Sequence, residues 1–242
     1  MILYVNGDSH TAAAEAVNSF AFAEDDPALF YMGRIPHPAN IAVSWGKILS
    51  LAIKASFHCG AESASSNSRI IRTTREWLSK HEQRQELLVI IQWSTWEREE
   101  WLYEDKWLQV NASGSDWVPE ELQARYKQYV IDVDWNIATQ RCHDQAWELH
   151  QWLTDRKIRH LFFSGHSTFS DIQNQYDWGR HYMDPYLREG SYHNWLIQNG
   201  GSYANPKSYH FDAASHRLWA EHVLQYINRN QILDLVDEVS SN

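Results

Sequence analysis

A serine and a histidine at opposite ends of the chain have the surroundings that nucleophilic catalysis requires. Ser9 lies in the sequence GDSH, directly after a β-prone run at residues 2–5. His210 lies in the sequence YHF, shortly before an amphipathic helical pattern that begins near residue 215. A serine hydroxyl becomes a strong nucleophile when a histidine within hydrogen-bond distance takes its proton. We therefore predict that Ser9 is a nucleophile and that His210 is its general base.

A purely structural role is the alternative for Ser9. Serine is a preferred N-cap residue, and the alanine-rich stretch 9–22 is compatible with a helix. The position after a strand favours the catalytic interpretation, because functional groups gather at the carboxyl ends of strands in open α/β sheets. Backbone N–H groups at the start of a helix there would also stabilise an anion.

The elements that must position these residues alternate between strand and helix patterns. Strands are predicted at 2–5, 55–59, 87–93 and 158–163, and helices at 9–22, 41–54, 70–80, 120–152 (one helix or two) and 215–227. This alternation predicts an α/β fold with a central parallel sheet covered on both faces. We expect a single domain over residues 1–242, with surface loops near 24–40, an aromatic-rich excursion near 96–119 and a long loop near 164–207.

Both ends of the chain resemble the SGNH (GDSL-like) hydrolase family. The sequence ILYVNGDSHTA resembles the family's first block, and SYHFDAASHRLWAEHV is similar to its last block. HPANIAVSWGKILSLAIKA resembles the segment that leads to the second block, and SASSNSRIIRTT resembles bacteriophage-encoded members. The resemblance extends to about residue 80 and resumes at about residue 205.

This resemblance implies a three-layer α/β/α sandwich of the flavodoxin-like type and an activity on esters, often of lipids or acetylated sugars. It implies no metal and no organic cofactor. Carried over to this chain, Ser9 attacks the ester, His210 takes its proton, and the N–H of Ser9 donates to the oxyanion. Ala64 stands at the glycine position of the second block, and its N–H can donate as well.

The chain departs from the family pattern before the catalytic histidine. The family has an aspartate three residues before it, where this chain has Lys207. We predict Asp212 as the substitute that orients His210. A serine–histidine pair steered by a backbone carbonyl is the alternative.

A second departure concerns the third block, in which the family has an asparagine that donates to the oxyanion. Trp96 falls near that position in this chain. Asn67, Thr95 and Arg98 are the candidates for the missing donor, and the sequence leaves the choice among them open.

Charge and composition limit the partners. The formal net charge of −10, without any basic cluster, argues against a nucleic-acid partner and against an anionic membrane surface. The N-terminal residues lack a signal-peptide pattern, so we expect synthesis in the cytoplasm, and the phage-like motif makes association with a virion an option. The pair His143-Asp144 and the residue His150 have a helical spacing that could indicate a metal site. We treat this as the weaker alternative, because no third ligand beyond the pair and His150 is apparent.

The sequence thus predicts a serine esterase or carbohydrate deacetylase that acts on a small-molecule or carbohydrate ester. The rival hypothesis is a catalytically weak SGNH-fold protein with a carbohydrate-binding or virion-structural role. The 13 tryptophans support the rival only where they are exposed, since a buried indole fills the core and an exposed one can stack on a sugar ring. The SGHS sequence around His166 either lines the site or forms a plain strand-to-loop turn.

Overall fold

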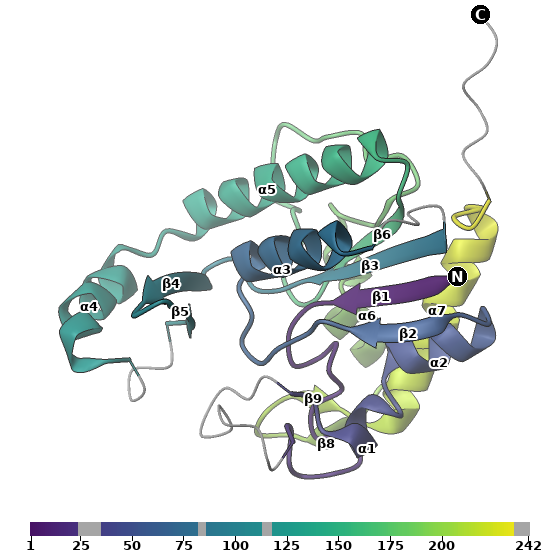
Figure 1. Ribbon diagram of the computed structural model, residues 1–242, viewed down its shortest axis with the longest axis horizontal. Coiled ribbons are helices and arrows are strands. Elements are labelled where there is room, and N and C mark those ends of the chain that lie inside the picture. Colours follow the sequence, from purple (N-terminus) through teal and green to yellow (C-terminus); the bar gives the residue numbers. More distant parts are fainter. Residues whose placement is uncertain (24–34, 82–85, 113–117, 235–242) are drawn as a thin grey trace, which may run out of the picture.

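Five parallel strands form one sheet at the centre of the molecule (Figure 1). A computed structural model describes residues 1–23, 35–81, 86–112 and 118–234. The strand order is β2-β1-β3-β6-β7. The strands are β1 (Ile2–Asn6), β2 (Ser56–Cys59), β3 (Leu87–Trp93), β6 (Arg159–Ser164) and β7 (Tyr182–Met183). From β1 the chain moves first to one side of the sheet and then to the other, so the carboxyl end of β1 lies at a switch point where ligands bind in such sheets.

Helices cover both faces of this sheet (Figure 1). One layer holds α3 (Asn67–Ser79) and α5 (Trp135–Asp155), and the other holds α2 (Trp45–Ala52), α6 (Tyr192–Gln198) and α7 (Ala213–Arg229). Successive strand residues alternate between the two layers, since Tyr4 packs with the first and Val5 with the second. All seven residues of β3 are buried, as expected for a central parallel strand. The predicted α/β class with a central parallel sheet is confirmed.

The four predicted strands correspond to β1, β2, β3 and β6. The helical region 120–152 contains the short η2 (Glu120–Leu122), then α4 (Gln123–Asp132) and most of α5. The helix expected at 41–54 begins only at Trp45, because the hydroxyl of Ser44 caps it by accepting the N–H of Lys47. A separate short α1 (Pro38–Ile41) precedes it.

The prediction of a helix at 9–22 is wrong. The segment forms successive turns, because Ala13 and Glu15 adopt left-handed φ angles of 54° and 63°. The buried side chain of Asn40 accepts the backbone N–H groups of Val17 and Asn18, at 3.0 and 2.8 Å. These tertiary contacts override the helical preference of the alanines.

The regions predicted as loops contain short elements of their own. The 164–207 segment holds β7, η3 (Arg188–Gly190), α6 and β8 (Tyr203–Asn205), and β8 pairs with β9 (His210–Phe211). The 96–119 excursion is a hairpin of β4 (Glu99–Tyr103) and β5 (Lys106–Val110), with 113–117 outside the described residues. Of the loop expected at 24–40, residues 24–34 also lie outside them. No helix among the described residues has the length and apolar character of a membrane span.

Candidate active site

Ser9 lies just beyond the carboxyl end of β1, in a turn that requires a glycine at position 7. A Cβ on Gly7 would lie 2.3 Å from the hydroxyl oxygen of Thr11 and 3.0 Å from the Cβ of Gln92. The same hydroxyl donates to the side chain of Gln92 at 2.8 Å, which ties the turn to β3. Ser9 retains 9% of its surface exposed at the edge of a cavity. Its hydroxyl can therefore meet a ligand.

His210 approaches Ser9 from the other end of the chain. Its Nε2 lies 3.0 Å from the Oγ of Ser9. His210 begins β9, whose antiparallel pairing with β8 holds the backbone, and Tyr209 turns the chain with a φ of 60°. The structure thus brings together the two residues that we singled out in the sequence.

Glu15 contacts the other nitrogen of the imidazole. Its Oε2 lies 2.5 Å from the Nδ1 of His210, and the side chains of Asn205 and Ser208 also donate to its carboxylate. Burial alone would raise the pKa of Glu15, but the hydrogen bonds from Ser208, His210 and Asn205 hold it below its ordinary value. An ionised Glu15 fixes Nδ1 as the protonated nitrogen and leaves Nε2 free to accept the proton of Ser9.

Asp212, which we expected to orient His210, has another role. Its carboxylate accepts the backbone N–H and the hydroxyl of Ser215, both at 2.8 Å, and it is the N-cap of α7. Lys207 is exposed, and its N–H donates to the side chain of Asn205. Glu15 therefore occupies the place beside His210 that we had assigned to Asp212. No motif pointed to Glu15, because it comes from the segment that we expected to be helical.

Ala64 lies in the wall of the same cavity as Ser9. It has a φ of 53°, in the left-handed region where a side chain costs about 1–2 kcal/mol. Glycine adopts this conformation without that cost. Within the described part of the chain, the N–H groups of Ser9 and Ala64 have no acceptor, so both remain available to an oxyanion.

Two of the three candidates for the missing donor do not line this cavity. The side chain of Asn67 is buried, where its Oδ1 accepts the N–H of Ser94 at 2.8 Å and its Nδ2 donates to the carbonyl of Ser94. These bonds tie the start of α3 to the end of β3. The hydroxyl of Thr95 donates to Glu97 at 3.1 Å. Trp96 is buried and stacks on Phe169, with ring centroids 4.7 Å apart.

Arg98 does line the cavity. Its Nη1 donates to the carboxylate of Asp8 at 3.1 Å and to the hydroxyl of Ser94 at 2.8 Å. Asp8 is fully buried and also accepts from Gln92 and from the N–H of His10. This network holds a cation in the wall of the cavity that Ser9 also lines, so Arg98 is the one of the three candidates that faces this cavity.

The cavity around Ser9 has a volume of about 740 Å³. The residues in its wall include Ser9, His10, Glu15, Ala64, Arg98, His166 and His210. His166 lies with its Nε2 2.9 Å from the Nε2 of His10. Burial lowers the pKa of His10 well below its ordinary value and that of His166 to about 4, so both rings are neutral near pH 7.

The histidines considered for a metal site lie elsewhere. His143 contacts the hydroxyl of Tyr186 at 3.0 Å, and His150 contacts His160 at 2.9 Å. Across the residues that the structure describes, no three His, Cys, Asp or Glu side chains are grouped as a metal site.

The fold and the site together define an α/β protein with a parallel sheet, in which Glu15, His210 and Ser9 are joined by hydrogen bonds beyond the carboxyl end of β1. In sequence, residues 23–237 match the model of a family of unknown function, DUF6071, and the chain belongs to this family. No curated protein matches the chain.

Solved structures show distant likenesses. One is a carbohydrate esterase whose active site displays divergent catalytic and non-catalytic binding functions, with 14% identity and a TM-score of 0.45 over 96% of this chain and 66% of that chain. Another is the acetyl xylan esterase Est2A from the rumen bacterium Butyrivibrio proteoclasticus, with 12% identity and a TM-score of 0.44 over 96% and 64%. A third, described as a lipolytic protein of the G-D-S-L family from Desulfitobacterium hafniense, has 11% identity and a TM-score of 0.34 over 93% and 99%. The chain spans just under two thirds of the length of the first two.

Proposed function

We propose that this protein is a serine esterase in which Ser9 is the nucleophile, His210 the general base and Glu15 the residue that orients His210. The observation that carries the proposal is the continuous chain of contacts from Glu15 through both nitrogens of His210 to the Oγ of Ser9, at 2.5 and 3.0 Å. A nucleophile, a base within hydrogen-bond reach and a third group that orients the base are the signature of an activated serine.

In the first half of the reaction, the Oγ of Ser9 attacks the carbonyl carbon of the ester while Nε2 of His210 takes the hydroxyl proton. The tetrahedral oxyanion accepts hydrogen bonds from the N–H groups of Ser9 and Ala64 and from the guanidinium of Arg98. The carbon–oxygen bond to the alcohol then breaks, and His210 returns its proton to the leaving oxygen. Glu15 stabilises the imidazolium while it exists.

In the second half, a water molecule loses a proton to His210 and attacks the acyl carbon on Ser9. The bond to Oγ breaks, the acid leaves, and His210 reprotonates Ser9. The proposed chemistry requires no redox partner and no metal. We include acetyl esters of carbohydrates among the proposed substrates, because the cavity beside Ser9 is large enough for an alcohol far bigger than a small alkyl group.

A fluorophosphonate probe tests the nucleophile directly, because it reacts covalently with activated serines. We expect the probe to label Ser9, and we expect the parent protein to hydrolyse p-nitrophenyl acetate in the presence of EDTA. Ser9→Ala should abolish labelling and most turnover. Ser63→Ala is the matched control, since Ser63 lines the same cavity and no hydrogen bond joins it to His210 in the described part of the chain.

Turnover by Ser9→Ala at the parental rate would overturn the proposal. The alternative is then a catalytically weak protein of this fold with a carbohydrate-binding or virion-structural role. Trp135, the exposed first residue of α5, is the observation that favours a carbohydrate ligand in either case.

A further inference from the structure

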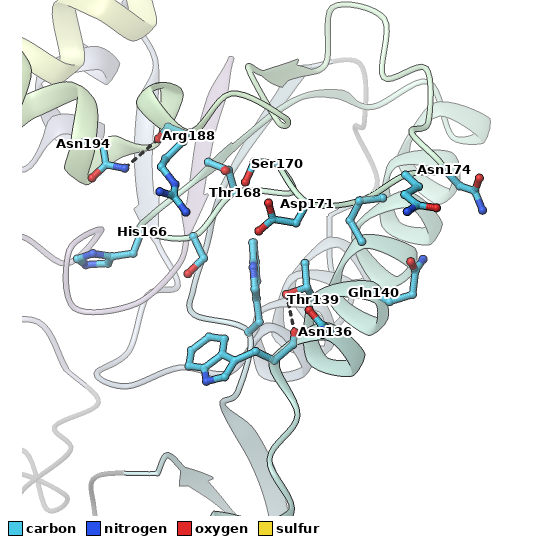
Figure 2. Close-up of a pocket in the computed structure, with 15 residues that line it drawn as sticks. Asn136, Thr139, Gln140, His166, Thr168, Ser170, Asp171, Asn174, Arg188 and Asn194 are labelled. Atoms are coloured by element: carbon cyan, nitrogen blue, oxygen red, sulfur yellow. Dashed lines mark hydrogen bonds between the residues drawn. The ribbon is translucent and has the colours of Figure 1, made fainter.

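A second cavity, of about 560 Å³, lies between the start of α5, the segment after β6 and η3 (Figure 2). We call it the polar cleft. All but three of the 15 residues that line it are polar, the exceptions being Trp96, Trp135 and Ile172. Pockets for drug-like ligands are mostly apolar with a few polar groups. The reverse composition here suits a ligand that carries many hydroxyl groups.

The polar cleft adjoins the cavity around Ser9. His166 lines both, and its ring contacts His10, the residue that follows Ser9. Figure 2 shows His166 at one end of the row of labelled side chains, with Gln140 and Asn174 at the other. A ligand that extends from Ser9 past His166 therefore enters the polar cleft.

The charges of the polar cleft balance. Arg188 and Asp171 carry its two formal charges, and neither side chain has a hydrogen-bond or ion-pair partner among the residues described. In Figure 2 both side chains extend into the space between η3 and α5. The lowered pKa of His166 keeps its ring neutral near pH 7. A site with equal and opposite charges favours a neutral ligand over an anion or a cation.

Amide side chains supply most of the remaining polar groups. The amides in the lining are Asn136, Gln140, Gln173, Asn174 and Asn194. Each amide carries two donor hydrogens and an acceptor. Gln140 and Asn194 each already donate one hydrogen bond within the protein, to Asp144 and to the carbonyl of Arg188. Sugar hydroxyl groups also donate and accept, so these side chains match a carbohydrate better than a ligand with acceptors alone.

Trp135 adds an apolar surface beside these groups. It is the first residue of α5 and is 51% exposed, whereas most tryptophans of the described chain are buried or half-buried. Asp134 fixes the start of the helix by accepting the N–H groups of Asn136 and Ile137, at 2.8 and 3.1 Å. An exposed indole beside hydrogen-bonding groups can stack against the apolar face of a sugar ring while the hydroxyl groups of the sugar meet the amides.

We propose that the polar cleft binds the sugar chain of a neutral oligosaccharide ester, with Trp135 as a stacking platform and the acyl group placed at Ser9. The placement of the acyl group rests on the proposed function, whereas the binding of the sugar does not depend on catalysis.

The sugar site is tested with the Ser9→Ala protein, so that turnover cannot interfere. Binding of xylohexaose, cellohexaose, maltohexaose and chitohexaose is measured by titration calorimetry. We expect saturable binding of at least one of them, weakened about tenfold by the added substitution Trp135→Ala. Ile137→Ala is the matched control, because Ile137 is 68% exposed on the same helix and lies outside the polar cleft. The control should bind as tightly as the Ser9→Ala protein.

Turnover provides the second readout, with the acetylated form of the bound hexasaccharide compared with p-nitrophenyl acetate. Trp135→Ala should lower the ratio of the two kcat/KM values, oligosaccharide over p-nitrophenyl ester, about tenfold. If no hexasaccharide binds, or if Trp135→Ala binds like the control, the polar cleft is not a sugar site. Binding that depends on Trp135 without hydrolysis of either ester would instead contradict only the esterase proposal.

Discussion

The Oε2 of Glu15 lies 2.5 Å from the Nδ1 of His210, although the two residues are 195 positions apart in the chain. Glu15 belongs to the turns that follow β1, so the segment that carries the proposed nucleophile also carries the acid that orients its base. The left-handed φ of 63° at Glu15 directs the chain so that its side chain faces β9 rather than continuing a helix. Backbone strain of this kind persists where the surrounding contacts determine it, and it clusters at functional sites.

The first prediction concerns Glu15. Glu15→Gln should lower kcat for p-nitrophenyl acetate by about 10²–10⁴-fold with a smaller change in KM, because an amide no longer fixes the imidazole in the productive tautomer. The pKa of Glu15 is lowered in the folded state, so the carboxylate stays ionised above that pKa and its contribution is lost only as the pH falls through it. The contribution of Glu15 to kcat should therefore be fully present at neutral pH. Steady-state kinetics of the parent and of Glu15→Gln at neutral pH measure the difference in kcat and KM.

Asp212→Asn is the control for Glu15→Gln. Asparagine is also a good N-cap, so α7 keeps its hydrogen bond to the N–H of Ser215, and only the carboxylate charge is lost. We expect parental kinetics from this variant. A large loss of kcat in Asp212→Asn, with little effect of Glu15→Gln, would restore the assignment made from the sequence.

The fold was accessible from the sequence because its central strands are continuous apolar runs. Leu87–Trp93 is buried along its whole length, and its shortness together with its β-branched residues favours a strand over a buried helix. The two-residue β7 was not predictable in the same way, because two residues carry no periodicity. Its position depends on its pairing with Phe162 and Phe163 of β6.

The site was accessible only in part. Ser9 and His210 could be predicted because each lies beside a recognisable element. Glu15 could not, since its position depends on left-handed turns and on contacts with Asn205 and Ser208 that local sequence does not encode. Arg98 was one of three alternatives that the sequence left open. It differs from Asn67 and Thr95 in that it lines the cavity around Ser9, which only the structure shows.

The second prediction concerns Arg98 as a donor to the oxyanion. Its removal should lower kcat by about 10²–10³-fold, the usual cost of losing one such donor. Arg98→Met alone should also destabilise the protein by about 3–5 kcal/mol, because it leaves the buried carboxylate of Asp8 without its cation. The double variant Asp8→Asn/Arg98→Met removes that buried charge. It should recover most of the melting temperature but not the rate.

Melting temperatures and kcat for p-nitrophenyl acetate, measured on the single and double variants, separate the two roles of Arg98. A double variant with parental kcat would show that the guanidinium acts only on Asp8. The oxyanion would then rely on the backbone N–H groups of Ser9 and Ala64.

The third prediction concerns the pH dependence of stability and a histidine cluster formed by residues of α5, of β6 and of the segment just before β7. The Nδ1 of His150 lies 2.9 Å from the Nε2 of His160, whose ring stacks on that of His181 with centroids 4.3 Å apart. Burial lowers the pKa of all three, to about 4 for His150 and well below the ordinary 6.5 for His160, and neighbouring histidines lower the pKa values of His150 and His160 further.

The sign of the effect follows from the proton balance. Below pH 6.5 these histidines are protonated in the unfolded chain but stay neutral where they are buried in the folded protein. Because the unfolded state then binds more protons, the free energy of unfolding falls as the pH drops toward 4. Between pH 7.5 and pH 5, a histidine that stays neutral in the folded state contributes a loss of about 2 kcal/mol. His160→Gln removes that titration and keeps polar atoms that can reach His150. Urea unfolding at both pH values should show a loss about 2 kcal/mol smaller in the variant than in the parent. An equal loss in both proteins would mean that His160 accepts its proton without unfolding.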